Sequence, residues 1–439
     1  MQTDILIIGA GASGLAAAYE LSLVNKKLVV LEAKDRIGGR INSIRDEHFK
    51  QIVETGAEFI HGKLPITLKL LDKAGIKYHS ARGKMWQVEK GELKKTDDFI
   101  EGWNRLIKKL RTLEKDISIK EFLDENFPDE KDKALKDSVI HFVQGYDAAE
   151  ITKASSLALR EEWENEDNNQ ERIDKGYIEL VNFLSDETKK RGNDIILSRT
   201  VKTITWQKGN TEIITTNNEH FTASKVLITI PLGVWQAEGK EGAISFAPDL
   251  REKKEAAKKM GFGAVIKMNF QFQNQFWEEE TKNKFINAGF IFSDAEIPTW
   301  WTQNPQKNGI LTGWLAGPDA FKLKDATEEH LFEKAIRVLS YIFNVTENFI
   351  KQKLVAWHIT NWTADPFIRG AYSYATLDTH WAKNILRQPV AQTLYFAGEA
   401  LYNGTEYGTV EGALANGIEV ARQIIIESKQ EQPKKTPPV

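Results

Sequence analysis

The 439-residue sequence contains no cysteine. This absence excludes disulfide bonds, thiolate catalysis, iron–sulfur clusters and zinc sites with cysteine ligands. It fits a reducing compartment, and we expect a cytoplasmic protein. An excess of one charge is also lacking, because 59 Lys and Arg residues balance 62 Asp and Glu residues. This balance gives no basic footprint, so no nucleic-acid partner is expected.

Long apolar runs are missing as well. The longest uncharged stretch lies between Asp4 and Glu20, which is too short for a membrane span and contains three glycines, so no membrane partner is expected. The first expected strand begins next to Met1, and we therefore expect no signal peptide. What the sequence does contain is 41% hydrophobic residues and 12 tryptophans, typical of a packed globular protein. Its length fits about two or three domains.

A glycine-rich turn stands near the start of the chain. Residues 4–8 form a short apolar run that predicts a buried parallel strand, residues 12–22 predict a helix, and residues 28–31 predict a second strand. Between the first two lies GAGASG at residues 9–14. In such a loop Gly9 permits the tight turn, Gly11 lets the backbone approach a pyrophosphate, and Gly14 allows close packing of helix on strand. Together these features predict a dinucleotide-binding βαβ unit.

Two further groups follow the second strand. Glu32 lies about 18 residues after Gly14, where a carboxylate accepts hydrogen bonds from ribose hydroxyls. Gly38 and Gly39 allow close backbone approach, and the fixed donor fork of Arg40 suits a phosphate. This continuation resembles the flavin amine oxidase family, which comprises monoamine oxidases, polyamine and spermine oxidases, L-amino-acid oxidases and lysine-specific histone demethylases.

The resemblance extends along nearly the whole chain and is closest in its motifs to polyamine and spermine oxidases. It is carried by residues 54–62 (ETGAEFIHG), 176–177, 201–204, 230–233, 263–270, 362–374, 396–399 and 408–413. It implies an α/β fold in which a discontinuous Rossmann-like FAD-binding domain is interleaved with an α+β substrate domain. The expected boundaries are 1–75, 191–240 and 385–430 for the first, 76–190 and 241–384 for the second, and a disordered tail at 431–439.

The inserted blocks have their own patterns. Residues 65–190 are mostly charged and apolar at helical spacing, whereas a period near two predicts strands at 260–272, 310–315 and 371–376. No GxSxG, Walker or HExxH motif occurs, and no metal site is expected.

The resemblance also implies a reaction. A neutral amine passes a hydride from its α-carbon to flavin N5, the imine hydrolyses, and O2 reoxidises the flavin to give hydrogen peroxide. Three residues take catalytic roles by this resemblance: Lys267 near N5, Tyr372 as one wall of an aromatic cage, and His61 facing the substrate amine. The second cage tyrosine of monoamine oxidases is replaced here by Thr409.

The FAD contacts implied by the resemblance are Gly9, Gly11, Ser13, Gly14, Glu32, Arg40, Gly56, Glu58, Phe59, Val201, Glu399, Thr409 and Val410. The cysteine that binds flavin covalently in monoamine oxidases corresponds to Ala371, so FAD is expected to be held non-covalently.

A polyamine is the favoured substrate. The acidic run at 161–167 could attract a polycation at the pocket mouth, although a solvated helix face explains it as well. A monoamine or an L-amino acid is an alternative; the latter needs an arginine clamp, for which Arg160 and Arg369 are candidates by charge alone. A flavin-binding interaction protein without turnover is a further alternative. The expected state is a monomer or homodimer.

Overall fold

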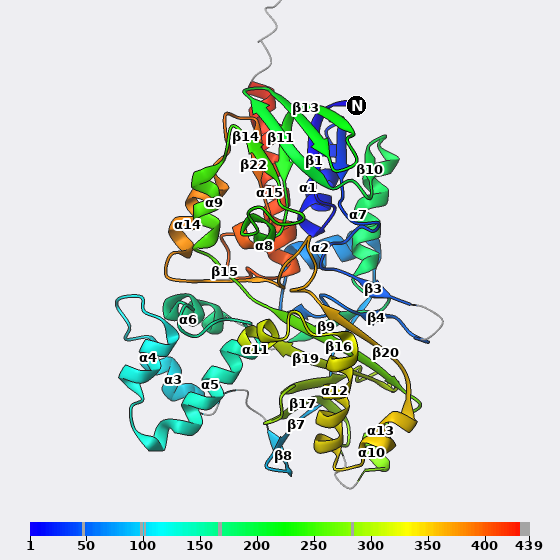
Figure 1. Ribbon diagram of the computed structural model, residues 1–439, viewed down its shortest axis with the longest axis vertical. Coiled ribbons are helices and arrows are strands. Elements are labelled where there is room, and N and C mark those ends of the chain that lie inside the picture. The colour runs from blue at the N-terminus through cyan, green and yellow to red at the C-terminus, as the bar shows by residue number, and fades with distance from the viewer. Residues whose placement is uncertain (46–48, 97–99, 101, 166–168, 282–284, 431–439) are drawn as a thin grey trace, which may run out of the picture.

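The computed structural model describes residues 1–45, 49–96, 100, 102–165, 169–281 and 285–430. The expected tail at 431–439 therefore lies outside the described residues. Figure 1 shows two sheets, one above the other, with a lobe of helices beside the lower one.

The upper sheet contains the predicted βαβ unit. Its parallel strands have the order β10 (Asp194–Ile196), β2 (Leu28–Leu31), β1 (Gln2–Ile8) and β13 (His220–Ile228), with β22 (Leu394–Phe396) also paired to β13. An antiparallel extension adds β12 (Asn210–Thr215) and β11 (Val201–Gln207), and β14 (Ser245–Ala247) closes that edge. The last four residues of β1 are buried, as expected for a strand covered on both faces.

Helices cover both faces of this sheet. Helix α1 (Ala12–Ser22) packs against α7 (Ile178–Lys190) and α15 (Val410–Gln430), while α9 (Arg251–Lys258) and α14 (Thr379–Arg387) pack together on the other side. Because α7 and β14 pack with the upper sheet, we propose that residues 178–190 and 245–247 belong to the FAD-binding domain. The boundaries expected from the sequence, at 190 and 240, assign both segments to the substrate domain.

The lower sheet is mixed. Its order is β20 (Leu354–Asn361), β16 (Val265–Phe272), β19 (Ile310–Ala316), β18 (Thr299–Thr302), β17 (Ala288–Ser293), β7 (Lys84–Glu89) and β8 (Glu92–Thr96). Helices α12 (Glu328–Phe343) and α13 (Glu347–Lys353) bury one face of it. Strand β16 is buried throughout, and its period of two sends Ile266, Met268 and Phe270 into that core. Lys267 therefore points to the opposite face.

Residues 65–190 are only partly helical. The structure has α2 (Pro65–Ala74), α3 (Trp103–Leu110), α4 (Ile119–Asn126), α5 (Lys133–Gly145) and α6 (Ser156–Asn165), but β6 (Tyr78–Ser80), β7, β8 and β9 (Gln170–Ile173) interrupt them. The expectation of helices is wrong for β7 and β8, because Lys90 and Gly91 between them both have positive φ and make a tight hairpin turn. The strand expected at 371–376 shrinks to β21 (Ser373–Tyr374), paired with β15 (Gly261–Phe262).

Two small pairings hold the segment between the sheets. Strand β3 (Ser43–Ile44) pairs with β4 (Val53–Glu54), and β5 (Ile60–His61) pairs with β9. Residues 55–59 lie between these pairings, so their backbone is fixed from both ends beside Lys267.

Candidate active site

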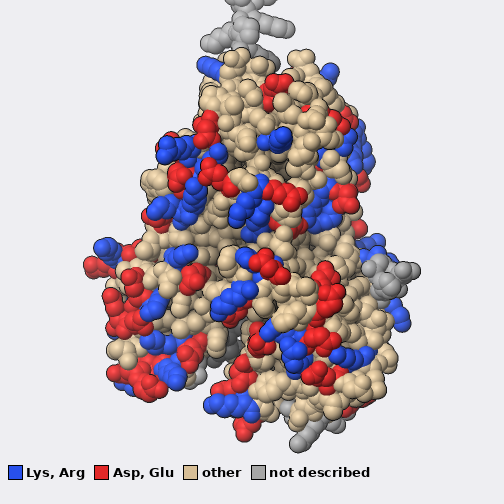
Figure 2. Space-filling view, in the orientation of Figure 1, with Lys and Arg blue, Asp and Glu red and all other residues tan. Residues whose placement is uncertain are grey.

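A single large cavity joins the upper sheet, the lower sheet and the helical lobe. Its volume is about 1600 Å³, whereas a pocket for one small ligand has about 300–1,000 Å³. It runs from the amino terminus of α1 past Lys267 to an outer part between α5 and β17. Figure 2 shows a notch between the helical lobe and the lower sheet, with acidic and basic side chains interspersed on the face around it. The size suits a cofactor and a substrate together.

The glycine loop forms one end of this cavity. A Cβ atom on Gly14 would stand 2.0 Å from the carbonyl oxygen of Gly9, so helix and strand approach as closely as the sequence predicts. Gly11 is the N-cap of α1 and makes no side-chain capping bond. Ser13 Oγ is buried and has no hydrogen-bond partner among the described residues. A helix amino terminus with a spare buried hydroxyl suits a phosphate.

Glu32 and Arg40 line the same end of the cavity. Glu32 accepts hydrogen bonds from the amides of Ala10 (2.6 Å) and Lys34 (3.0 Å), and burial raises the pKa of its carboxyl group. Arg40 Nη1 donates to the carbonyl oxygen of Ala371 (2.6 Å) and to Glu399 Oε1 (2.8 Å). A guanidinium has five N–H donors, so Arg40 retains donors for an anion.

Glu399 ties three cavity segments together. Its carboxylate also accepts from Ser373 Oγ (2.6 Å) and the amide of Gly408 (3.1 Å). The hydroxyl of Thr409 accepts from the amide of Gly412 (3.1 Å) at the start of α15. These bonds align the α15 amino terminus, with Thr409 and Val410, along the cavity, and Val201 lines it from β11.

These features fit FAD. The loop, the spare Ser13 hydroxyl, the ribose-type carboxylate Glu32 and the second helix terminus at Val410 supply the donors and acceptors that a dinucleotide with two phosphates needs. They therefore form a candidate dinucleotide-binding site.

Lys267 is buried at the middle of the cavity, with an exposed fraction of 1%. Its Nζ donates to Glu58 Oε2 (2.7 Å) and to the carbonyl oxygen of Gly56 (3.0 Å). Burial would raise the pKa of Glu58, but the charges of Lys267 and Arg172 outweigh it and lower that pKa to about 2. The expected lysine is therefore present as half of a buried ion pair.

An aromatic wall adjoins Lys267. The rings of Tyr372 and Trp314 are stacked with centroids 6.5 Å apart, and Trp301 lies 5.8 Å from Trp314. The Tyr372 hydroxyl donates to the carbonyl oxygen of Tyr146, and Trp314 Nε1 donates to that of Gly145 (2.8 Å). The cage residue expected from the sequence is thus held by the carboxyl end of α5.

His61 also lines the cavity. Its ring lies 5.9 Å from that of Phe59 and 6.0 Å, edge-on, from that of Tyr146. Burial lowers the pKa of His61 to about 4, so the imidazole is neutral near pH 7. Within the described part of the chain, no hydrogen bond uses its ring nitrogens, which leaves one of them as an acceptor.

Two carboxylates lie near Tyr372. Asp147 and Glu162 both line the cavity, and Tyr407 donates its hydroxyl hydrogen bond to Glu162 Oε2 (2.9 Å). The pKa of Tyr372 is raised well above its ordinary value by burial and then by the charges of Asp147 and Glu162. Of the acidic run, Glu161 is exposed, Glu164 pairs with Arg111 (2.6 Å), and residues 166–167 lie outside the described residues.

The structure places Lys267, His61 and Tyr372 on one cavity, together with twelve of the thirteen expected cofactor contacts. The exception is Gly14, which packs against the carbonyl oxygen of Gly9 and does not line the cavity. Sequence reasoning missed Arg172, Trp314, Asp147 and Tyr407. The position of Tyr407 two residues before Thr409 was a usable signal, whereas nothing in the local sequence singled out the other three.

The chain belongs to the flavin-containing amine oxidoreductase family, whose model matches residues 12–425. It is 28% identical to human lysine-specific histone demethylase 2, over 96% of this chain and 53% of that protein. It is 26% identical to polyamine oxidase 2 of Arabidopsis thaliana, over 95% of this chain and 87% of the relative. The chain thus spans about half the length of the histone demethylases it matches.

Solved structures share the fold. A putrescine oxidase bound to putrescine superposes with a TM-score of 0.79 at 19% identity, covering 97% of this chain and 99% of that one. The cyclohexylamine oxidase of Brevibacterium oxydans gives a TM-score of 0.79 at 17% identity, with the same coverage. The described helices include none that is long and apolar enough to cross a membrane.

Proposed function

We propose that this flavin amine oxidase acts on polyamines or diamines. The observation that carries the proposal is the pair of carboxylates, Asp147 and Glu162, which lie near Tyr372 in the cavity that Lys267 also lines. Aromatic faces and carboxylates together favour a cation, so they suit the second ammonium of a substrate whose first amine is oxidised. The similarity to a polyamine oxidase supports the same class.

The protein residues position the amine and manage its proton. Bound FAD supplies the chemistry of hydride acceptance and of reoxidation by O2, with hydrogen peroxide as the product. The neutral imidazole of His61 accepts a hydrogen bond from the substrate nitrogen, which orients the amine in its reactive neutral form. Lys267 places a positive charge at the cavity wall and orders water beside it. The Lys267→Met variant should retain flavin but slow flavin reduction or reoxidation sharply.

We also propose that FAD is held non-covalently. The position before the cage tyrosine is Ala371, and the sequence contains no cysteine. Acid precipitation of the protein should therefore leave yellow FAD in the supernatant; colour that stays in the pellet would contradict non-covalent binding.

Two other substrate classes are less well supported. An L-amino acid needs a cationic clamp, but Arg160 donates to the carbonyl oxygens of Leu110 and Leu113, and Arg369 donates to that of Glu241. Neither arginine lines the cavity. A methylated histone lysine is the second candidate, because the chain matches human lysine-specific histone demethylase 2 over 96% of its length.

A substrate panel with peroxide detection tests the proposal. It should contain putrescine, spermidine, spermine, N-acetylated polyamines, benzylamine, L-amino acids and a dimethyl-lysine histone peptide. We expect turnover of a diamine or polyamine, and Asp147→Asn should lower its kcat/KM by about tenfold, the effect of about 1.4 kcal/mol. The same variant should leave any benzylamine turnover within about twofold, since that substrate has no second cation. Equal losses for both substrates, or turnover of the peptide alone, would refute the proposal.

A further inference from the structure

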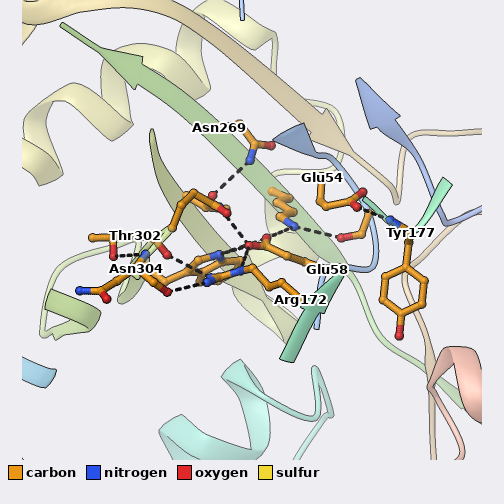
Figure 3. A network of polar contacts seen from close by, with 12 residues as sticks. Glu54, Glu58, Arg172, Tyr177, Asn269, Thr302 and Asn304 are labelled. Atoms are coloured by element: carbon orange, nitrogen blue, oxygen red, sulfur yellow. Dashed lines mark hydrogen bonds and ion pairs between the residues drawn. The ribbon is translucent and has the colours of Figure 1, made fainter. Parts of the chain in front are cut away.

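Glu58 stands at the centre of a buried network that reaches three parts of the fold. Its carboxylate accepts from Lys267 Nζ (2.7 Å), Arg172 Nε (2.9 Å), Trp301 Nε1 (3.1 Å to both oxygens) and Gln303 Nε2 (3.1 Å). Figure 3 shows Glu58 beside Arg172, with Thr302 and Asn304 on one side and Glu54 on the other. Two cations and two neutral donors thus satisfy one carboxylate.

The network fixes the ammonium of Lys267. An ammonium has three N–H donors, and two of them are used by Glu58 and by the carbonyl oxygen of Gly56. The third donor remains for the cavity, which Lys267 lines. Nζ also lies 5.3 Å from the ring of Trp301, so a rigid aromatic covers it.

Arg172 makes the Glu58 carboxylate immobile in turn. Besides Glu58, its guanidinium donates to the carbonyl oxygens of Thr302 (3.0 Å) and Asn304 (3.2 Å), and it lies 4.4 Å from the ring centroid of Phe59. Arg172 is 6% exposed and Glu58 is 6% exposed. Removing one partner of a buried pair leaves an uncompensated charge, so the positions of Arg172 and Glu58 depend on each other.

We propose that Glu58 is the positioning residue for Lys267: it pairs with the ammonium and holds the one remaining N–H toward the cavity, where the flavin would bind. The inference rests on the proposed role of Lys267, but it concerns the charge state and direction of that side chain rather than the choice of substrate. Without Glu58, a buried ammonium would face only the cation of Arg172 and the more distant Glu54, and would give up its proton readily.

The test follows the visible absorption of bound flavin as the pH is varied. The charged groups that act on this region are Glu58, Glu54 and Arg172. In Glu58→Gln we expect a new pH-dependent spectral change on the alkaline side of neutrality, because the buried ammonium of Lys267 has lost its carboxylate partner. The double variant Glu58→Gln with Lys267→Met should lack this change, whereas any change caused by Glu54 should remain in all the proteins.

Two controls separate positioning from structure. Gln303→Ala removes a neutral donor from the same carboxylate and should give the wild-type spectral titration. The double variant Glu58→Gln with Arg172→Gln removes one charge of each sign. It replaces Glu58→Gln in the spectral titration if that single variant does not fold. The new titration in either glutamine variant supports the proposal, and a wild-type titration in both, with flavin bound, overturns it. A negative substrate panel would leave this spectral result intact, so the two proposals fail independently.

Discussion

Glu54 gives a prediction about stability that can be worked out from the structure. Burial raises the pKa of this carboxyl group to about 7, although hydrogen bonds from Ser43 Oγ (2.7 Å) and the amide of Tyr177 (2.6 Å) oppose the shift. In the unfolded chain the pKa is 4.5. The folded protein therefore binds one more proton than the unfolded chain between about pH 4.5 and about pH 7.

This proton determines the sign and size of the change in the free energy of unfolding with pH. The folded state keeps its proton until about pH 7, so the free energy of unfolding falls as the pH rises through this window and stays low above it. The difference between the two pKa values corresponds to about 3 kcal/mol. The Glu54→Gln variant is neutral at every pH and keeps an oxygen for the amide of Tyr177. It should be about as stable as the wild type below the window and more stable above it, by up to about 3 kcal/mol.

Urea unfolding of holoenzyme at matched FAD concentration measures this difference across the pH range. Infrared spectroscopy should also detect a protonated carboxyl group in the wild type at pH 6 or so, absent from Glu54→Gln. The exposed Glu92→Gln change removes the same charge from the surface and should give a pH-independent difference. If Glu54→Gln gains no stability above neutrality relative to this control, the assignment of a proton to Glu54 is wrong.

Three further outcomes follow from the site. Gly14→Ala places a Cβ 2.0 Å from the carbonyl oxygen of Gly9 and should abolish FAD retention on gel filtration; Gly145→Ala meets open space and should retain it. Tyr372→Phe loses the hydroxyl bond to Tyr146 but keeps the ring, so kcat/KM should fall by about tenfold or less, whereas Tyr372→Ala should cost much more. Because the pKa of His61 is about 4, His61→Gln should raise KM without removing an ionisation from the rate profile above pH 6 or so; loss of one would refute the neutral imidazole.

The sequence predicts the parts of this protein whose causes are local. Residues 4–31 form strand, turn, helix and strand because apolar runs, glycines and alanines follow one another in the order that a βαβ unit needs. The same reasoning failed for the β7–β8 hairpin, where Trp86 and Val88 pack at a period of two against the lower core. Charged residues around them suggested a helix, and the turn at Gly91 was the overlooked signal.

Long-range pairing could not be predicted. Glu58 meets Arg172 and Lys267 across sequence separations of 114 and 209 residues, and nothing in a single sequence links those positions. Family resemblance placed Lys267 near the flavin, but it assigned Glu58 to the cofactor and gave Lys267 no counter-ion. The charge state of a buried lysine depends on its partners, so it could be inferred only after the structure placed Glu58 and Arg172 near Lys267.

The helical lobe adds a second reason why substrate choice lies beyond the sequence motifs. The sequence suggested an incomplete cage because Thr409 replaces a tyrosine, yet Tyr407 and Trp314 also line the cavity. Trp314 and Tyr372 are hydrogen-bonded to the carboxyl end of α5, so the aromatic wall is attached to the lobe. Asp147 and Glu162 come from that same lobe. Changes in the lobe should therefore alter which amine is accepted while FAD binding, which depends on the upper sheet, is preserved.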